Sequence, residues 1–112
     1  MYRLFLDDIR IVKDVFPQMQ EHDFTIVRSY NAFVSEIKTN GLPVFISFDN
    51  DLGADEHGNI LPEGYDCAKW LVYESGIYIA ELKFNVHSAN PVAKKQIEGL
   101  LNNYIEFIKN KE

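Results

Sequence analysis

The sequence predicts a single α/β domain over residues 1–112, with a four-stranded parallel sheet of order 2-1-3-4 and helices on both faces. Short apolar runs alternate along the chain with segments of helical periodicity. Three of the apolar runs end abruptly in acidic or polar residues, as parallel strands do where they open into loops. With 112 residues, 46% of them hydrophobic, the chain is long enough for one core and too short for two.

The first strand is predicted at Tyr2 to Leu6, a mostly apolar run that stops at Asp7 and Asp8. The following stretch, Ile9 to Asp23, has no clear period and contains a proline. We therefore expect a loop there, with at most a short helix around residues 12–16.

A second strand, a helix and a third strand follow. Phe24 to Arg28 has the composition of a strand, and Ser29 is a suitable cap for the helix that comes next. Apolar residues recur at helical spacing until Asn40 and Gly41, which are typical helix stops. Val44 to Phe48 is the most strand-like run in the chain.

The C-terminal half contains a long loop, two helices and the last strand. Leu52 to Gly64 is rich in Gly, Asp and Pro, which predicts a surface loop able to act as a lid. Tyr65 to Ser75 is predicted to be helical, with a glycine stop, and Leu82 to Val86 to be the fourth strand. Asn90, followed by proline, predicts the start of a long amphipathic helix.

Charge and composition exclude several classes of partner. The net charge of −6, from 17 acidic and 11 basic residues, argues against binding along an extended nucleic acid, although a short nucleotide or an RNA end remains open. Cys67 is the only cysteine, so no internal disulfide can form. There is no targeting segment and no apolar run near the ~20 residues that a membrane helix needs, so we expect a cytoplasmic protein that does not bind membranes.

Polar side chains follow three of the four predicted strands. In open parallel sheets the ligand site lies beyond the carboxyl ends of the strands, and the order 2-1-3-4 makes these three strands neighbours. We therefore expect one crevice to collect the residues that follow them, which are Asp7, Asp8, Asp49, Asp51, His87 and Ser88.

Carboxylates gathered in one crevice repel each other unless a cation or protons neutralise them, and oxygen ligands suit Mg²⁺ or Mn²⁺. The sequence thus predicts a divalent metal on Asp7, Asp8 and Asp49, with open positions for a phosphate. A single aspartate at a strand end is more often a simple cap. A pair followed by a second cluster on the adjacent strand favours the metal site.

Four further residues are candidates for contact with the phosphate. His87 can transfer a proton near neutral pH, and Ser88 can donate a hydrogen bond to a phosphate oxygen. The helix that starts at Asn90 has free amides in its first turn, which suit an anion. Arg10 can either clamp a phosphate or pair with Asp8 or a loop acid, and the sequence does not decide between these roles.

Four motifs, in this order and spacing, resemble those of the cyclic-phosphate processing receiver-like domains, which are relatives of bacterial response-regulator receivers. They are LFLDDIR at 4–10, SFDNDLG at 47–53, GYD at 64–66 and VHSANP at 86–91. The resemblance covers nearly the whole chain, and VHSANP is its most specific part. It implies a truncated flavodoxin-like fold and a role in opening or removing cyclic phosphates, often beside RNA repair.

The resemblance also implies roles for individual residues. Asp7 and Asp8 match the receiver metal-binding pair, and Asp49 matches the receiver phosphoacceptor. Asp51, His87 and Ser88 match additions peculiar to the cyclic-phosphate group. Receivers also place a lysine after a fifth strand, and we expect this chain to end on its fourth helix without one, which weakens a role in phospho-signalling.

Three functions remain open from the sequence. The first is a metal-dependent phosphodiesterase acting on a 2′,3′-cyclic RNA end or a small cyclic nucleotide, in which Asp51 activates water and His87 protonates the departing ribose oxygen. The second is a non-catalytic module that binds a phosphorylated ligand or a protein partner. The third, ranked last, is a signalling receiver that accepts a phosphoryl group on Asp49.

Overall fold

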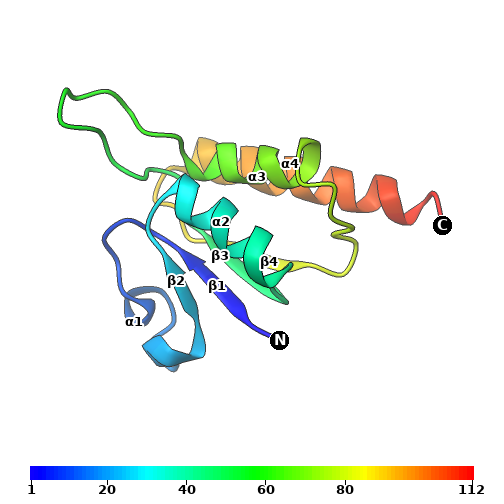
Figure 1. The fold of residues 1–112 in the computed structure, drawn as a ribbon, viewed down its shortest axis with the longest axis horizontal. Helices are drawn as coiled ribbons and strands as arrows, with labels where there is room; N and C mark the ends of the chain where they lie inside the picture. The colour runs from blue at the N-terminus through cyan, green and yellow to red at the C-terminus, as the bar shows by residue number, and fades with distance from the viewer.

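A four-stranded parallel sheet of order β2-β1-β3-β4 forms the centre of the molecule, as predicted (Figure 1). The computed structural model describes all 112 residues. β1 pairs with β2 on one side and with β3 on the other, while β4 pairs with β3 alone. The receiver-like α/β fold expected from the sequence is confirmed. The strands are β1 (Arg3–Leu6), β2 (Thr25–Val27), β3 (Phe45–Phe48) and β4 (Lys83–Val86).

Helices begin and end close to the residues that the sequence predicts. The Ser29 hydroxyl accepts the amide of Ala32 and caps the second helix, which ends at Gly41, where φ is 84°. A left-handed backbone of this kind is readily adopted only by glycine. The helical segments are α1 (Val12–Val15), the 3₁₀ helix η1 (Glu21–Asp23), α2 (Tyr30–Asn40), α3 (Gly64–Tyr73) and α4 (Pro91–Lys109).

The two faces of the sheet are covered unequally. Alternate strand residues such as Leu4, Leu6 and Phe48 pack in the larger core cluster with residues of α2, α3 and α4. Phe5, on the opposite face, packs in a small cluster with Val12 of α1 and with apolar residues around η1. Helices therefore lie on both faces, but the thick layer is on one of them. None of the helices combines the length and apolar character needed to cross a bilayer.

The segment between β3 and α3 differs from the expected irregular loop. Ala54 and Ile60 form an antiparallel bridge, and the amide of Leu61 donates to the carbonyl of Gly53 at 3.0 Å. The Asp55 carboxylate accepts hydrogen bonds within the turn that joins the two arms. The segment is thus a small hairpin, and it extends away from the rest of the domain (Figure 1, green). The hydrogen bonds between its two arms could not be predicted from local composition.

Candidate functional site

The carboxyl ends of β1, β3 and β4 lie side by side, because Leu6 pairs with Phe48 and Phe48 with Val86. The polar residues that follow these strands are therefore brought to one edge of the sheet, as expected. A crevice of about 320 Å³ opens there. Its lining includes six of the candidate residues, namely Asp8, Arg10, Asp49, Asp51, Ser88 and Asn90. Asp7 and His87 are the two candidates that lie beneath it.

Asp7 forms the floor of the site and is fully buried. Its Oδ1 accepts the amides of Ile9 at 3.0 Å and Arg10 at 2.8 Å, which shapes the turn after β1. Its Oδ2 lies 3.1 Å from Nη1 of Arg10 and 2.9 Å from Nε2 of His87. Burial alone would raise the pKa of Asp7, but these hydrogen bonds outweigh it and lower the pKa below its ordinary value. Asp7 is therefore ionised and held in a fixed orientation.

Asp49 follows β3 and is 5% exposed. Its Oδ1 accepts the amide of Asn50 at 2.8 Å. Burial, together with the negative charge of Asp7, raises its pKa to about 6, and Asp8 adds to the shift. The shift is thus due first to burial and then to the neighbouring carboxylates, while the Arg10 guanidinium acts in the opposite direction.

Arg10 is the only Lys or Arg side chain that forms ion pairs with this cluster. Its Nη1 lies 3.1 Å from Oδ2 of Asp7 and 3.5 Å from Oδ1 of Asp49. Of the partners that the sequence left open, Asp8 is not paired with Arg10, whereas Asp49, an acid in the loop after β3, is. The turn that Asp7 caps directs the guanidinium back over β1 and β3. One guanidinium facing four aspartates leaves a large excess of negative charge in the crevice.

Arg28, which follows β2, supports the site but was not among the residues predicted from the sequence. Its Nη1 donates to the backbone carbonyls of Asp7 at 3.0 Å and Arg10 at 2.6 Å. A charged donor on two carbonyls of the same turn fixes the backbone that carries Asp8. The signal that could have revealed Arg28 is the strand order, which puts the end of β2 beside the end of β1.

His87 is held from both sides beneath the crevice. Its Nε2 lies 2.9 Å from Asp7, its Nδ1 lies 2.7 Å from the hydroxyl of Ser47, and its side chain is 4% exposed. The ring stacks on Phe5, with centroids 4.9 Å apart and planes at 6°. Burial lowers the pKa of His87, so the imidazole is neutral at pH 7. Ser47 was not predicted, although a polar residue inside an apolar strand was the available signal.

The direction of these hydrogen bonds follows from the neighbouring amide. Asn85 donates to the hydroxyl of Ser47 at 3.5 Å, which leaves the Ser47 hydrogen free for Nδ1 of His87. The proton of the neutral ring then lies on Nε2 and is donated to Asp7. Both nitrogens of the imidazole are thus engaged with protein groups and neither faces the crevice.

A family model described as the cyclic-phosphate processing receiver domain matches residues 2–103. The chain belongs to this family. Searches of curated proteins and of solved structures gave no match. Membership confirms the resemblance carried by the four motifs. It also makes the protein a receiver-like domain associated with cyclic-phosphate processing, for which a phosphate-containing ligand is the natural expectation.

The start of α4 corrects one expectation for this cyclic-phosphate receiver domain. Asn90 Oδ1 itself accepts the amides of Val92 at 3.0 Å and Ala93 at 3.1 Å, and Pro91 has no amide hydrogen. The amide of Lys94 donates to the carbonyl of Asn90. The first turn therefore has no free amides for an anion, because the cap has already used them. The side-chain amide of Asn90 is the donor that remains at this position.

Ser88 lies between β4 and α4 at the rim of the crevice. Its hydroxyl oxygen accepts the amide of Asn90 at 3.1 Å. This contact uses a lone pair, so the hydroxyl hydrogen can still be donated toward the crevice. On the opposite rim, Oδ1 of Asp51 accepts the amide of Gly53 at 2.9 Å, while the second carboxylate oxygen makes no hydrogen bond to the protein.

The donor groups of the receiver domain fit a divalent cation. Atoms of Asp7, Asp49 and His87 lie within 4.8 Å of one another, and the two carboxylates are the members of this group that offer oxygen ligands, because both His87 nitrogens are hydrogen-bonded to the protein. Asp8 lies beside them, with its Oδ2 close to the backbone of Gly53, where an added Cβ would be 3.2 Å away. Arg10 is the one guanidinium that pairs with this cluster, so the aspartates outnumber the positive charge beside them. Hard oxygen donors with unmatched charge are the chemistry that Mg²⁺ and Mn²⁺ prefer.

Proposed function

We propose that this receiver domain is a metal-dependent phosphodiesterase that opens a cyclic phosphate, either a 2′,3′-cyclic RNA end or a small cyclic nucleotide. A single observation carries the proposal. Asp7, Asp8 and Asp49 meet at one edge of the sheet with only the Arg10 guanidinium between them, and family membership associates the domain with cyclic phosphates. RNA-end repair would be one setting for this chemistry.

Asp7, Asp8 and Asp49 would hold the Mg²⁺ or Mn²⁺ ion. When bound, such an ion polarises the phosphoryl oxygens and stabilises the negative charge that develops on them. Asp7 and Asp49 contribute fixed positions, because both are buried and hydrogen-bonded. This preorganisation means that little rearrangement of the carboxylates is needed during the reaction.

Arg10, Ser88 and Asn90 would bind the phosphate. The Arg10 side chain is 35% exposed, so it can turn from Asp7 and Asp49 toward an oxygen in the crevice without leaving a buried cavity. A guanidinium can grip two oxygens of a phosphate at once. The Ser88 hydroxyl and the Asn90 amide lie on the opposite rim and can donate to the remaining oxygens.

Asp51 would orient the attacking water and accept its proton. It is exposed at the crevice rim, and its free carboxylate oxygen is available to water. Direct protonation of the departing ribose oxygen by His87 would require the ring to leave Asp7 and Ser47. The contacts of His87 support a second role, in which it holds Asp7 in place, and the two roles are separable by mutation.

The hydrogen bonds of His87 to Ser47 and Asp7 also favour a second candidate function. A domain with no free imidazole nitrogen in its crevice can bind a phosphorylated ligand without turning it over. A protein partner carrying that phosphate is compatible with the same crevice. This non-catalytic reading predicts saturable binding of ligand that is recovered unchanged.

The direct test is to incubate the protein and Mg²⁺ or Mn²⁺ with RNA oligomers ending in a 2′,3′-cyclic phosphate, and with cyclic mononucleotides. The phosphodiesterase predicts metal-dependent ring opening that Asp49→Asn abolishes. Asp14→Asn is the matched control, because Asp14 lies in α1, outside the crevice. Binding without turnover would favour the non-catalytic module. If the metal-bound protein turns over none of these cyclic phosphates, the proposed phosphodiesterase activity is rejected.

A further inference from the structure

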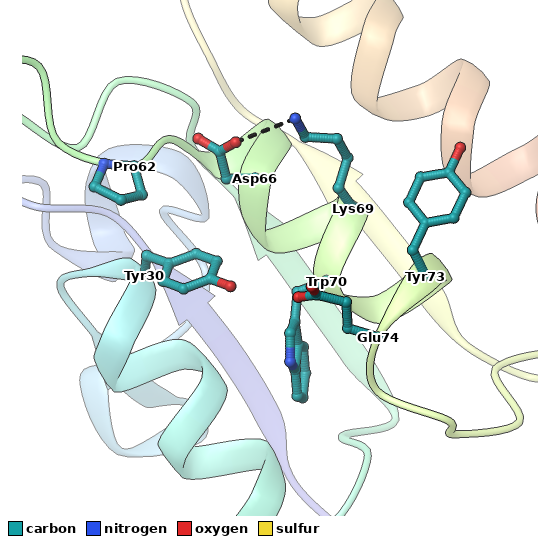
Figure 2. A pocket seen from close by; sticks show the side chains of 7 residues that line it. All are labelled: Tyr30, Pro62, Asp66, Lys69, Trp70, Tyr73 and Glu74. Carbon is teal, nitrogen blue, oxygen red and sulfur yellow. Dashed lines mark ion pairs between the residues drawn. The ribbon is translucent and has the colours of Figure 1, made fainter.

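A second cavity, of about 510 Å³, lies between α2 and α3 and shares no lining residue with the acidic crevice. Figure 2 shows Tyr30 of α2 pointing toward Glu74 and Trp70 of α3, with Pro62 at one end and the side chains of Lys69 and Tyr73 directed outward. Aromatic and charged groups dominate the lining. They are Tyr30 from α2, and Asp66, Lys69, Trp70, Tyr73 and Glu74 from α3 and its end.

Three aromatic rings form the walls, and two of them bring polar atoms that have no partner in the protein. Trp70 is 6% exposed, and its indole N–H and the Tyr30 hydroxyl make no hydrogen bond to the protein; no buried side-chain nitrogen or oxygen lacks a partner, so both atoms are accessible from the cavity. Tyr73 is 70% exposed, so packing does not explain its position. The faces of such rings attract cations, most strongly where water is partly excluded.

The charges around the cavity do not balance. Lys69 Nζ lies 3.3 Å from Asp66 and 5.0 Å from the centre of the Tyr65 ring, so these two charges match each other. The Glu74 carboxylate forms no ion pair and accepts no hydrogen bond from the protein. Burial raises the pKa of the Tyr30 hydroxyl, and the charge of Glu74 adds to the effect, which indicates that the two groups are close.

The end of α3 strengthens the negative potential at the same place. Glu74 is the C-cap residue of α3, where the carbonyl ends of the helix carry partial negative charge. An unmatched carboxylate, the negative end of a helix and aromatic faces are each favourable to a positive charge. Together they make a cation of suitable size the best complement to this cavity.

We propose that the cavity between α2 and α3 binds the cationic head of an organic ligand, a guanidinium or a primary ammonium group. Glu74 would form the ion pair, Tyr30 and Trp70 would lie beside the head group, and Tyr73 would lie at the outer edge of the cavity. The ligand is either a free amine or the side chain of an arginine or lysine on a partner. The net charge of −6 would attract such ligands. This proposal does not depend on the chemistry of the acidic crevice.

Trp70 is the only tryptophan in the chain, so its fluorescence reports on this cavity. The first experiment titrates the full chain with N-butylguanidinium and with N-butylurea, which has nearly the same shape without the charge. We expect a saturable fluorescence change with the guanidinium and little or none with the urea. Equal responses to the two compounds, or no response to either, would overturn the proposal. Adenosine that binds more tightly than the guanidinium would overturn it as well, in favour of a nucleobase.

Two variants test the assigned groups. Glu74→Gln keeps the shape and removes the charge, and we expect it to weaken binding of N-butylguanidinium about tenfold. Tyr73→Ala should weaken it several-fold. Both residues are exposed, so both variants should fold, and melting curves check this. Glu81→Gln and Tyr78→Ala are matched controls, because these exposed residues lie outside the cavity. Unchanged affinity in Glu74→Gln would disprove the ion pair.

A final comparison identifies the source of the cation. Agmatine represents a free amine, and an amidated Gly-Arg-Gly peptide represents a side chain on a partner. Tighter binding of agmatine supports a small-molecule ligand, whereas tighter binding of the peptide supports a protein partner. Failure of both, together with failure of N-butylguanidinium, rejects the site. None of these measurements involves turnover of a cyclic phosphate, so the outcome is independent of the phosphodiesterase.

Discussion

Gly64 lies directly against the backbone of Asp49, so that a Cβ added at Gly64 would be 1.8 Å from the Asp49 carbonyl oxygen. The amide of Gly64 donates to the carbonyl of Asn50 at 2.8 Å, and the Asn50 side chain accepts the amide of Tyr65 at 3.0 Å. The first turn of α3 is thereby fastened to the segment that carries Asp49. The position of the acidic crevice thus depends on the absence of a side chain in another element.

Gly64→Ala should therefore destabilise the protein by about 3 kcal/mol or more, since backbone must move to admit the methyl group. It should also weaken Mg²⁺ binding, because Asp49 would shift. Gly99→Ala in α4 is the matched control. An added Cβ there meets nothing within 4 Å, and alanine in a helix should stabilise by about 0.5–1 kcal/mol. Urea denaturation checks both values, and equal effects of the two substitutions would contradict the close packing.

The second prediction concerns proton competition at Asp49, whose pKa is raised to about 6. A metal ligand must lose its proton to bind, so Mg²⁺ affinity should rise up to about tenfold per pH unit below pH 6 and level off above pH 7. In the metal-free protein, the stability of the fold should change with pH in the opposite direction to the Mg²⁺ affinity. A carboxyl whose pKa is raised on folding is stabilising when protonated, and this contribution is lost as the pH rises from about 4 to 6.

Calorimetric titration with Mg²⁺ and melting curves between pH 4 and pH 8 measure these two effects. Other carboxyls also titrate in this range, so the comparison is with Asp49→Asn, which removes the group. The variant should lose Mg²⁺ binding and should be more stable than the metal-free parent at pH 7. If parent and variant show the same pH dependence of the melting temperature, the Asp49 carboxyl is not the group that titrates.

The third prediction separates the two roles of His87. Replacement by alanine removes the acceptor of the Ser47 hydroxyl hydrogen and one of the two donors to Oδ2 of Asp7, which should destabilise the fold by about 2 kcal/mol. If His87 positions Asp7, His87→Gln should restore part of the Mg²⁺ affinity and turnover, because its amide can donate to the same carboxylate. If His87 is the proton donor, the glutamine variant will be as inactive as the alanine variant. His57→Ala serves as the control, because that side chain is 76% exposed.

A fourth prediction addresses the clamp formed by Arg28 on the turn after β1. Arg28→Met should remove two charged hydrogen bonds to carbonyls, lowering stability by about 1 kcal/mol and weakening Mg²⁺ binding several-fold. Arg3→Met is the matched control. Arg3 is an exposed arginine on β1, and its side chain forms no hydrogen bond or ion pair. Equal Mg²⁺ affinity in the two variants would show that Arg28 does not support the metal-binding turn.

The existence of the four strands was predictable, because alternation of apolar runs and helices is a local property of the sequence, and the order and the shared edge followed from the α/β fold class assigned to that alternation. The contacts of Arg10, Ser47 and Arg28 could not be predicted, because they depend on which strands are neighbours and on the direction in which each side chain points. The hairpin after β3 was not predicted, because residue composition does not show which residues of the segment form hydrogen bonds with each other. The absence of free amides in the first turn of α4 could have been predicted, because the side chain of a capping residue such as Asn90 accepts hydrogen bonds from those amides.

Arg10 gives the acidic cluster a partner from within the same chain, as the ion pairs with Asp7 and Asp49 show. These two buried carboxylates therefore have a positive partner in the folded protein whether or not the crevice is occupied. If an ion binds as proposed, it would compete with the Arg10 guanidinium for the carboxylates of Asp7 and Asp49. A newly made copy and a working copy of this protein would then differ in where one positive charge points.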